Sequence, residues 1–306
     1  MNQSAPFLAV CLFCPSLGAQ DKPARPKITG IDHVRLYVTD LDKSSRFYTK
    51  LLGVRPNGGA CNGKSGRCFT VGWEKNQRIE LQQAPASGTT NWVAEIAFAT
   101  DDIEKMRRYL VARGVTAGKV SKYTDAKHTL EAHFEVRDPE STAISFIQRF
   151  AHAMDDPGFV DPFHVRMLHA GFVVKDLAVE NHFYLDLLGF RLYWQGGFKD
   201  DALDWYEIQV PDGDNWVEYM LNIPANADHK ELGVQNHFSL GVKDIHATAQ
   251  QLRKNGLQEF DGPEIGRDGK WSLDAYDPDG TRIEFMEFTP AENPCCHPYT
   301  ADHPKP

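Results

Sequence analysis

The sequence lacks an apolar run of the roughly 18 residues that a helix needs to cross a bilayer, and it is short of basic residues. Lysine and arginine total 33 against 42 aspartates and glutamates, which gives a formal net charge of −9. A surface that binds the nucleic acid backbone is basic, so this balance argues against DNA or RNA. We therefore expect a small-molecule substrate, with no nucleic acid and no membrane as partner, and a monomer or homodimer.

The first 20 residues contain neither lysine nor arginine. Residues 6–19 are apolar and end in small residues, and charged residues begin only at Asp21, in a proline-rich stretch. Apart from the missing basic start, this arrangement is typical of a secretory signal. We predict a signal peptide over residues 1–20 and a linker over 21–29, hence a secreted or periplasmic protein. The alternative is a cytoplasmic protein with an apolar N-terminus.

Cysteine is scarce, and two of the six cysteines fall within the predicted signal peptide. In an oxidising compartment, Cys61 and Cys68 are spaced to close the glycine-rich loop between them; otherwise both remain thiols. The adjacent Cys295 and Cys296, followed by His297, offer at most an adventitious metal site.

The chain repeats itself, and the repeat decides the fold. Residues 33–55 and 169–191 align without a gap at an offset of 136 residues, with ten identities in 23 positions. Both contain a histidine, an alternating apolar run, Asp-Leu, a Phe-Tyr pair and Leu-Leu-Gly. A weaker repeat relates residues 95–114 to 237–256, each with a strand pattern, Asp-Ile, a helical stretch and a terminal glycine.

These repeats divide the chain into four modules, each a strand, a helix and further strands. The modules cover residues 30–82, 92–149, 166–222 and 234–288. Such a module cannot bury its apolar sheet face alone, whereas two paired edge to edge form a curved sheet with helices outside and a cup inside.

The fold class is therefore α+β, with two tandem domains that each contain two paired modules. Residues 30–150 form the first domain and residues 166–289 the second. Residues 151–165, which contain two prolines and a glycine, form a linker, and residues 290–306 form a C-terminal tail.

Strand alternation brings two histidines and two glutamates to the concave face of the second domain. These residues are His169, Glu218, His237 and Glu284. Their apolar neighbours, such as Phe172 and Phe238, fall on the opposite face, toward the helices. Because buried carboxylates need partners, two imidazoles and two carboxylates in one cup predict a divalent metal.

This pattern resembles the vicinal oxygen chelate superfamily, which includes glyoxalase I, methylmalonyl-CoA epimerase, fosfomycin-resistance enzymes, extradiol dioxygenases and bleomycin-resistance proteins. The resemblance covers residues 28–288 and implies two glyoxalase-like domains of paired βαβββ modules. The ligand order His–Glu–His–Glu is most similar to that of glyoxalase I. It implies one divalent metal (Zn, Ni, Fe or Mn) and an isomerase, lyase or epimerase that stabilises an enediolate or alkoxide. Glu284 or Glu218 would then act as the catalytic base.

The first domain carries a poorer set of side chains at the equivalent positions, namely His33, Glu80, Glu95 and Ser145. We expect a degenerate site there. Sequential pairing of the modules is favoured because neighbours are joined by short connections. If the first module instead paired with the fourth, the metal ligands would be His33, Glu80, His237 and Glu284.

Two other functions remain open. An extradiol-type iron dioxygenase is the first, although Glu218 fills a position that those enzymes leave without a ligand. A non-catalytic binding or resistance protein is the second. Candidate substrate-pocket residues are the aromatic side chains near the cup and one basic side chain: Trp205, Trp216, Trp271, Phe198 and Arg267.

Overall fold

The computed structural model describes residues 23–57, 66–71, 77–89, 91–124, 129–150 and 166–306. The predicted signal peptide, the predicted linker 151–165 and Cys61 lie outside these residues. In the described part of the chain, no helix is both long and apolar enough to span a membrane.

The first half of the chain forms one eight-stranded sheet. Its strands are β1 (Ile28–Val38), β2 (Arg55–Asn57), β3 (Gly66–Val71), β4 (Gln77–Gln83), β5 (Val93–Thr100), β6 (Ser121–Thr124), β7 (Thr129–Arg137) and β8 (Ala143–Arg149). They are ordered β2-β3-β4-β1-β5-β8-β7-β6.

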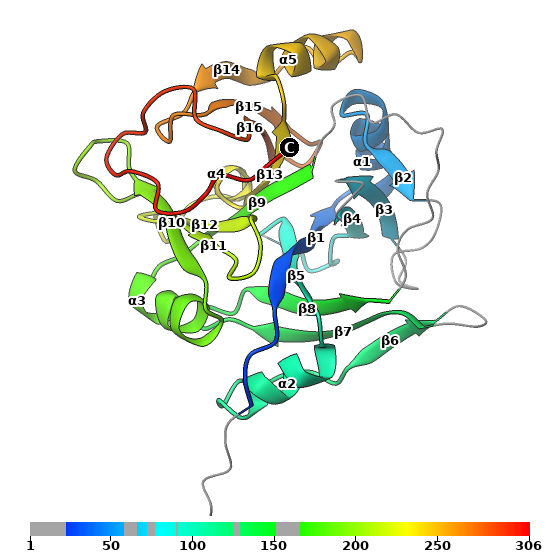
Figure 1. Cartoon of the computed structure of the whole chain (residues 1–306). Helices are drawn as coiled ribbons and strands as arrows, with labels where there is room; N and C mark the ends of the chain where they lie inside the picture. The colour runs from blue at the N-terminus through cyan, green and yellow to red at the C-terminus, as the bar shows by residue number, and fades with distance from the viewer. Residues whose placement is uncertain (1–22, 58–65, 72–76, 90, 125–128, 151–165) are drawn as a thin grey trace, which may run out of the picture.

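The second half forms a matching eight-stranded sheet (Figure 1). Its strands are β9 (Arg166–Val173), β10 (Arg191–Gly196), β11 (Trp205–Gln209), β12 (Trp216–Met220), β13 (His237–Val242), β14 (Asp261–Ile265), β15 (Trp271–Tyr276) and β16 (Arg282–Glu287). Their order, β10-β11-β12-β9-β13-β16-β15-β14, repeats that of the first sheet.

The modules pair in sequence order. β1 lies antiparallel to β5, and β9 lies antiparallel to β13, so each sheet is continuous across two consecutive modules. Within each module the last strand returns parallel to the first, as β12 does beside β9 and β16 beside β13. The predicted α+β fold of two domains with paired modules is confirmed.

Each module contributes one main helical segment between its first two strands. These segments are α1 (Leu41–Arg46) with the π-helical turn η1 (Phe47–Leu51), α2 (Ile103–Val111), α3 (Leu177–Asn181) with the π-helical turn η4 (His182–Leu187), and α5 (Ile245–Lys254). A further helix, α4 (His229–Gln235), precedes β13. The repeated aspartate of the Asp-Leu and Asp-Ile pairs explains where the four begin. Asp40, Asp102, Asp176 and Asp244 each accept hydrogen bonds from first-turn backbone N–H groups.

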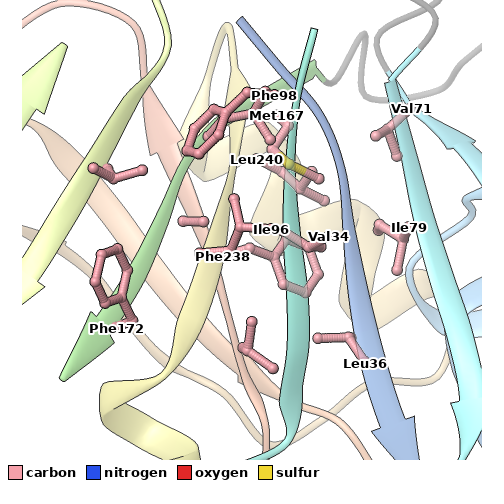
Figure 2. Packing of buried hydrophobic residues seen from close by; sticks show 14 of the residues in the cluster. Val34, Leu36, Val71, Ile79, Ile96, Phe98, Met167, Phe172, Phe238 and Leu240 are labelled. Carbon is pink, nitrogen blue, oxygen red and sulfur yellow. The ribbon is translucent and has the colours of Figure 1, made fainter. Parts of the chain in front are cut away.

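The apolar faces of the two sheets share one hydrophobic core. Figure 2 shows Val34 and Ile96 of the first sheet close to Phe238 of the second, with Ile79 and Phe172 farther out in the same core. We expected the apolar faces of the sheets to pack against the helices. These faces also pack against each other. The opposite, concave face of each sheet is therefore the face that carries the polar side chains.

The Phe-Tyr pair of the long repeat connects the two domains. The Tyr48 hydroxyl donates to Asp277 Oδ2 at 3.2 Å, and the Tyr184 hydroxyl donates to Asp138 Oδ2 at 3.2 Å. Both tyrosines are fully buried. Each lies in a π-helical turn, and each reaches the Asp-Pro turn of the other domain, which gives the interface two equivalent contacts.

Candidate metal centre

The four predicted ligands lie on the four central strands of the second sheet. His169 lies on β9, Glu218 on β12, His237 on β13 and Glu284 on β16. Adjacent residues such as Phe238 and Phe285 belong to the shared core on the other face. The four ligand side chains are all buried, so alternation along each strand brings them together at the bottom of the cup.

The donor atoms face one another. His169 Nε2 lies 3.0 Å from His237 Nε2 and 3.2 Å from Glu284 Oε2. Glu218 Oε2 lies 3.1 Å from His237 Nε2 and 3.6 Å from His169 Nε2. Donor atoms of His169, Glu218 and His237 all lie within 4.8 Å of one another. This is the spacing of atoms that share one cation.

Two neighbours orient the His237 ring. His237 Nδ1 lies 2.9 Å from the carbonyl oxygen of Gln235, an arrangement in which Nδ1–H donates and leaves the Nε2 lone pair toward the other ligands. Arg282 Nη2 also lies 2.8 Å from His237 Nε2. Arg282 is in turn close to Asp274 Oδ2, at 3.4 Å, so its charge belongs to the same buried cluster.

The absence of a side chain at Gly171 makes room for His237. A Cβ atom built at Gly171 would lie 2.1 Å from Cε1 and 2.4 Å from Nδ1 of the His237 ring. Both distances are far inside van der Waals contact, so any larger residue at this position displaces the imidazole.

The charges of the cluster keep both glutamates ionised. Burial raises the pKa of Glu284, but the hydrogen bond with His169 and the charges of His169 and Arg282 outweigh it and lower the pKa to about 2. The pKa of Glu218 is lowered as well, because the effects of His237 and His169 outweigh that of burial. Burial and the charge of Arg282 lower the pKa of His237, which favours the neutral imidazole that ligates metals.

The equivalent cup of the first domain is filled by protein cations. Arg35 occupies the position that corresponds to Gly171. Its guanidinium donates to Glu80 Oε2 from Nη2 at 2.9 Å and to Glu95 from Nη1. Ser145 donates to Glu95 as well. The predicted degenerate set is thus gathered around an arginine rather than left open.

His33 joins this ion network at a greater distance. Its Nε2 lies 3.7 Å from both Glu80 and Glu95, while its Nδ1 lies 2.7 Å from Asp32. Burial lowers the pKa of His33, but Glu80, Asp32 and Glu95 raise it above its usual value. The raised pKa favours the protonated form of His33, whereas a metal ligand must be a neutral imidazole.

The alternative pairing of the first module with the fourth does not occur in this structure. His33 and Glu80 lie on β1 and β4 of the first sheet, whereas His237 and Glu284 lie on β13 and β16 of the second. The structure therefore brings together the set His169, Glu218, His237 and Glu284.

The predicted substrate-pocket residues divide by position. Trp216 is fully buried, and its ring lies 4.9 Å from that of His169, so it forms a wall of the cup. Trp205 shares the cup face, where its ring stacks on Trp194 and packs at a tilt against Phe198. Phe198 itself is 74% exposed.

Two of these candidates lie away from the histidines. Trp271 lies on the helix side of β15, where its ring packs 4.8 Å from that of His246 on α5. Side chains alternate between the two faces along a strand. Asp274 pairs with Glu284 on the cup face, and Trp271 precedes Asp274 by three residues, so Trp271 points to the opposite face. Arg267 forms a surface ion pair with Asp200 and donates to the Gly197 carbonyl at 3.2 Å, so it does not face the cup.

Sequence reasoning missed further buried groups in the cup. Glu207 pairs with Glu218 across β11 and β12 and is 2% exposed. Lys270 is fully buried beside Trp216. Neither residue has a counterpart in the repeat that would draw attention to it. Glu207 could have been predicted, because it lies two residues after Trp205 on β11 and therefore on the same face.

The C-terminal tail covers part of this cup (Figure 1). Tyr299 and Ala301 pack against a small apolar cluster on the concave face, formed by Leu168, Tyr193, Trp216, Met286 and Phe288. The Thr300 backbone N–H donates to the Tyr193 carbonyl at 2.9 Å. Sequence reasoning gave the tail no role, because its contacts are with residues far away in the chain.

The cysteines form disulfides in the described residues. Cys295 is bonded to its neighbour Cys296, so the pair does not offer two thiolates to a metal. Cys68 is also disulfide-bonded. The predicted Cys61–Cys68 pairing stays a prediction, since Cys61 lies outside the described residues.

Comparison with known proteins gives a consistent relationship. A family model described as Glyoxalase/Bleomycin resistance protein/Dioxygenase superfamily matches residues 30–146 and again residues 166–285. A curated relative, lactoylglutathione lyase of Haemophilus influenzae, is 31% identical over 126 residues, which are 40% of this chain and 93% of that protein.

Solved structures resemble the whole chain. Homoprotocatechuate 2,3-dioxygenase of Brevibacterium fuscum superposes with a TM-score of 0.67 at 20% identity, over 92% of this chain and 84% of that one. The enzyme of the same name from Arthrobacter globiformis gives a TM-score of 0.65 at 19% identity, over 86% and 80%. At such identities the likeness shows the shared fold. With two matches that together cover most of its length, this chain belongs to the glyoxalase/bleomycin resistance protein/dioxygenase superfamily.

Proposed function

We propose that this protein is a divalent-metal-dependent enzyme of the glyoxalase I type, an isomerase, lyase or epimerase that acts on a small oxygenated substrate. One observation carries the proposal: donor atoms of His169, Glu218 and His237 lie within 4.8 Å of one another, and Glu284 Oε2 lies 3.2 Å from His169 Nε2. The 31% identical relative named lactoylglutathione lyase supports the same class of reaction.

The residues present fit such a metal. Nε2 of His169 and Nε2 of His237 lie 3.0 Å apart, so their lone pairs repel unless a proton or a cation lies between them. A metal at this position would replace the Arg282 N–H that lies 2.8 Å from His237 Nε2. Two imidazoles and two carboxylates suit Zn²⁺, Ni²⁺, Fe²⁺ or Mn²⁺. A divalent ion held there would supply Lewis-acid stabilisation of negative charge on substrate oxygens.

The protein's own part in the reaction is proton transfer and exclusion of water. Glu284, with a pKa of about 2, is ionised at neutral pH and is the proposed base. A pKa this low makes it a weak base, so its proton transfer depends on its position beside the substrate rather than on its basicity. Glu218 has a lowered pKa as well and is the alternative base. Trp216 and the apolar residues beside it keep the site dry, which strengthens each charge interaction within it.

A direct test is conversion of the hemithioacetal of methylglyoxal and glutathione by the metal-loaded protein, followed through thioester formation. If Glu284 is the base, Glu284→Gln lowers kcat by about 10² to 10⁴. Glu259→Gln, at an exposed position, is the matched control and leaves the rate unchanged. If glutathione adducts are not converted, epimerisation and isomerisation of other 2-oxygenated substrates are tested by solvent deuterium exchange, which reads proton abstraction directly. An absence of exchange with every substrate tried would count against the proposal.

The alternative functions make different predictions. An extradiol-type dioxygenase would bind iron and consume oxygen with catechols, and a sequestering protein would bind its ligand without turnover. Glu218 counts against the dioxygenase, because those enzymes have no ligand at this position. Here Glu218 Oε2 lies 3.1 Å from His237 Nε2, close enough for Glu218 to be a fourth protein ligand. Oxygen uptake on catechols by the iron-loaded protein would replace the lyase proposal.

A further inference from the structure

Lys270 is a buried lysine in the loop directly before β15. The residue has no exposed surface, and its Nζ hydrogen-bonds to none of the residues that the structure describes. Its nearest carboxylate oxygen, Asp268 Oδ2, lies 3.5 Å away, beyond a good hydrogen bond. An ammonium has three N–H donors, and burying it with all of them unused is costly.

Three aromatic rings surround the ammonium. Nζ lies 4.5 Å from the ring centre of Trp216, 4.9 Å from that of Tyr299 and 5.1 Å from that of Tyr193. Their π faces stabilise the positive charge. They offer no oxygen to its N–H groups, so the hydrogen-bonding capacity of the lysine stays available.

Asp268 is occupied by other partners. Its Oδ1 accepts the backbone N–H of Lys270 at 3.1 Å, and its Oδ2 accepts the hydroxyl of Tyr299 at 3.0 Å. The Tyr299 hydroxyl belongs to the C-terminal tail, so Asp268 serves to fasten the tail over the cup. It is therefore a shared partner rather than a dedicated counter-ion for Lys270.

Lys270 lies on the same side of the sheet as the metal centre. Trp216 contacts both, since its ring packs on His169 and lies under Nζ of Lys270. A second unpaired polar atom lies in the same cup, because Glu207 leaves Oε2 without a hydrogen bond among the described residues. Burial holds the pKa of Glu207 well above its usual value and outweighs the charge of Lys270, which lowers that pKa.

We propose that Lys270 binds a carboxylate of the substrate while the vicinal oxygens of that substrate face the four metal ligands. The substrate class is then a short, oxygenated acid with a second anionic group. Trp216, Tyr193 and Tyr299 form the walls that limit its size. The inference rests on the proposed function, because it takes the four ligands to hold a metal.

The test uses two pairs of probes that differ only by a carboxylate in place of a methyl group: L-malate against 2-hydroxybutyrate, and tartronate against lactate. Binding to the metal-loaded full chain is measured by isothermal titration calorimetry. A charged hydrogen bond is worth about 1.5–3 kcal/mol, so the diacid of at least one pair is expected to bind about 10- to 100-fold tighter. In Lys270→Met this preference falls to about twofold or less, with metal content unchanged.

Lys243→Met is the control, because Lys243 is an exposed lysine in the same domain. It is expected to keep the wild-type preference for the diacid. If the wild-type protein binds both members of each pair equally, or if Lys270→Met keeps the preference, the proposal is overturned. Metal content is measured on the same samples, so loss of the metal, which would defeat the proposed function, is distinguishable from loss of diacid preference.

A purely structural role for Lys270 predicts a different pattern. If the lysine only balances Asp268, Lys270→Met destabilises the protein by leaving a buried carboxylate unpaired, and the double variant Asp268→Asn with Lys270→Met recovers stability. In the double variant the diacid preference is expected to stay lost. A double variant that recovers both stability and the preference would overturn the assignment of Lys270 to substrate binding.

Discussion

Gly171 and Arg35 occupy equivalent positions in the two domains, and between them they decide which cup is open. The Gly171 position has no room for a Cβ, since His237 occupies that space. Arg35 extends its guanidinium to Glu80 and Glu95, so the positive charge of a metal is replaced by that of a side chain. Together with Glu95 in place of His237 and Ser145 in place of Glu284, this difference separates an ion network from a candidate metal centre.

Replacing Gly171 by alanine is expected to abolish metal binding. The added Cβ would lie 2.1 Å from His237 Cε1, so the ring must move out of the ligand set. Metal content falls by about tenfold or more, as when one ligand of a chelating set is lost. Elemental analysis after dialysis measures it.

Arg35→Ala is the matched control in the first domain. It breaks the buried pairs with Glu80 and Glu95, so it lowers the free energy of unfolding by about 3–5 kcal/mol but leaves metal content unchanged. Normal metal content in Gly171→Ala would contradict the role given to the glycine.

At the scale of elements, the π-helical turns η1 and η4 carry the tyrosines that join the domains. Tyr184 lies in η4 and donates to Asp138, which is itself buried. The Phe-Tyr pair of the repeat is therefore an interface element, whereas sequence alone shows only that the pair recurs.

Tyr184→Phe removes this hydroxyl and leaves the Asp138 carboxyl with one partner fewer. The free energy of unfolding is expected to fall by about 1–3 kcal/mol, measured by urea denaturation. The equivalent Tyr48→Phe, which removes the contact with Asp277, should cost a similar amount. Tyr123→Phe, at a tyrosine with 36% exposure, serves as control and should cost little. Wild-type stability in both interface variants would mean that the two contacts do not hold the domains together.

Helix α3 contributes a pH dependence through Glu180. The residue is fully buried, and its Oε1 accepts the Glu140 backbone N–H at 2.9 Å. Burial, with a further contribution from the charge of Asp138, raises its pKa from 4.5 to about 8. The folded protein therefore holds a proton that the unfolded chain releases between these values.

Because unfolding releases that proton, the stability that Glu180 contributes is fully present below pH 4.5 and is lost as pH rises toward about 8. Glu180→Gln cannot release a proton, so its unfolding free energy should decline less over this window than that of the wild type. Urea denaturation at several pH values measures the difference, with Glu259→Gln as control. Parallel curves for wild type and Glu180→Gln would show that Glu180 is ionised in the folded state.

At the scale of the whole molecule, repetition made the fold predictable. His33 and His169 stand at equivalent positions of an ungapped repeat, and that repeat fixed the number and order of the modules. Strand alternation then predicted the ligands, since Ala170 beside His169, and Val217 and Tyr219 beside Glu218, belong to the core on the other face.

The remaining features depend on contacts that no local pattern encodes. Trp271 was a pocket candidate only because it is aromatic, and its contact with His246 on α5 depends on how the helix packs on the sheet. Lys270 was missed because it has no equivalent in the repeat and its partners, Tyr193 and Tyr299, come from distant strands and from the tail. The union of both apolar faces in one core likewise follows from how the domains pack.

The central claim is that a divalent metal is held by His169, Glu218, His237 and Glu284, and metal content tests it most directly. The protein is purified without a chelating tag and measured by elemental analysis. We predict about one divalent ion per chain in the wild type and close to none in His237→Ala, because loss of one ligand opens the set. His182→Ala, at an exposed histidine, retains the metal. Metal content in His237→Ala equal to that of the wild type would contradict the account.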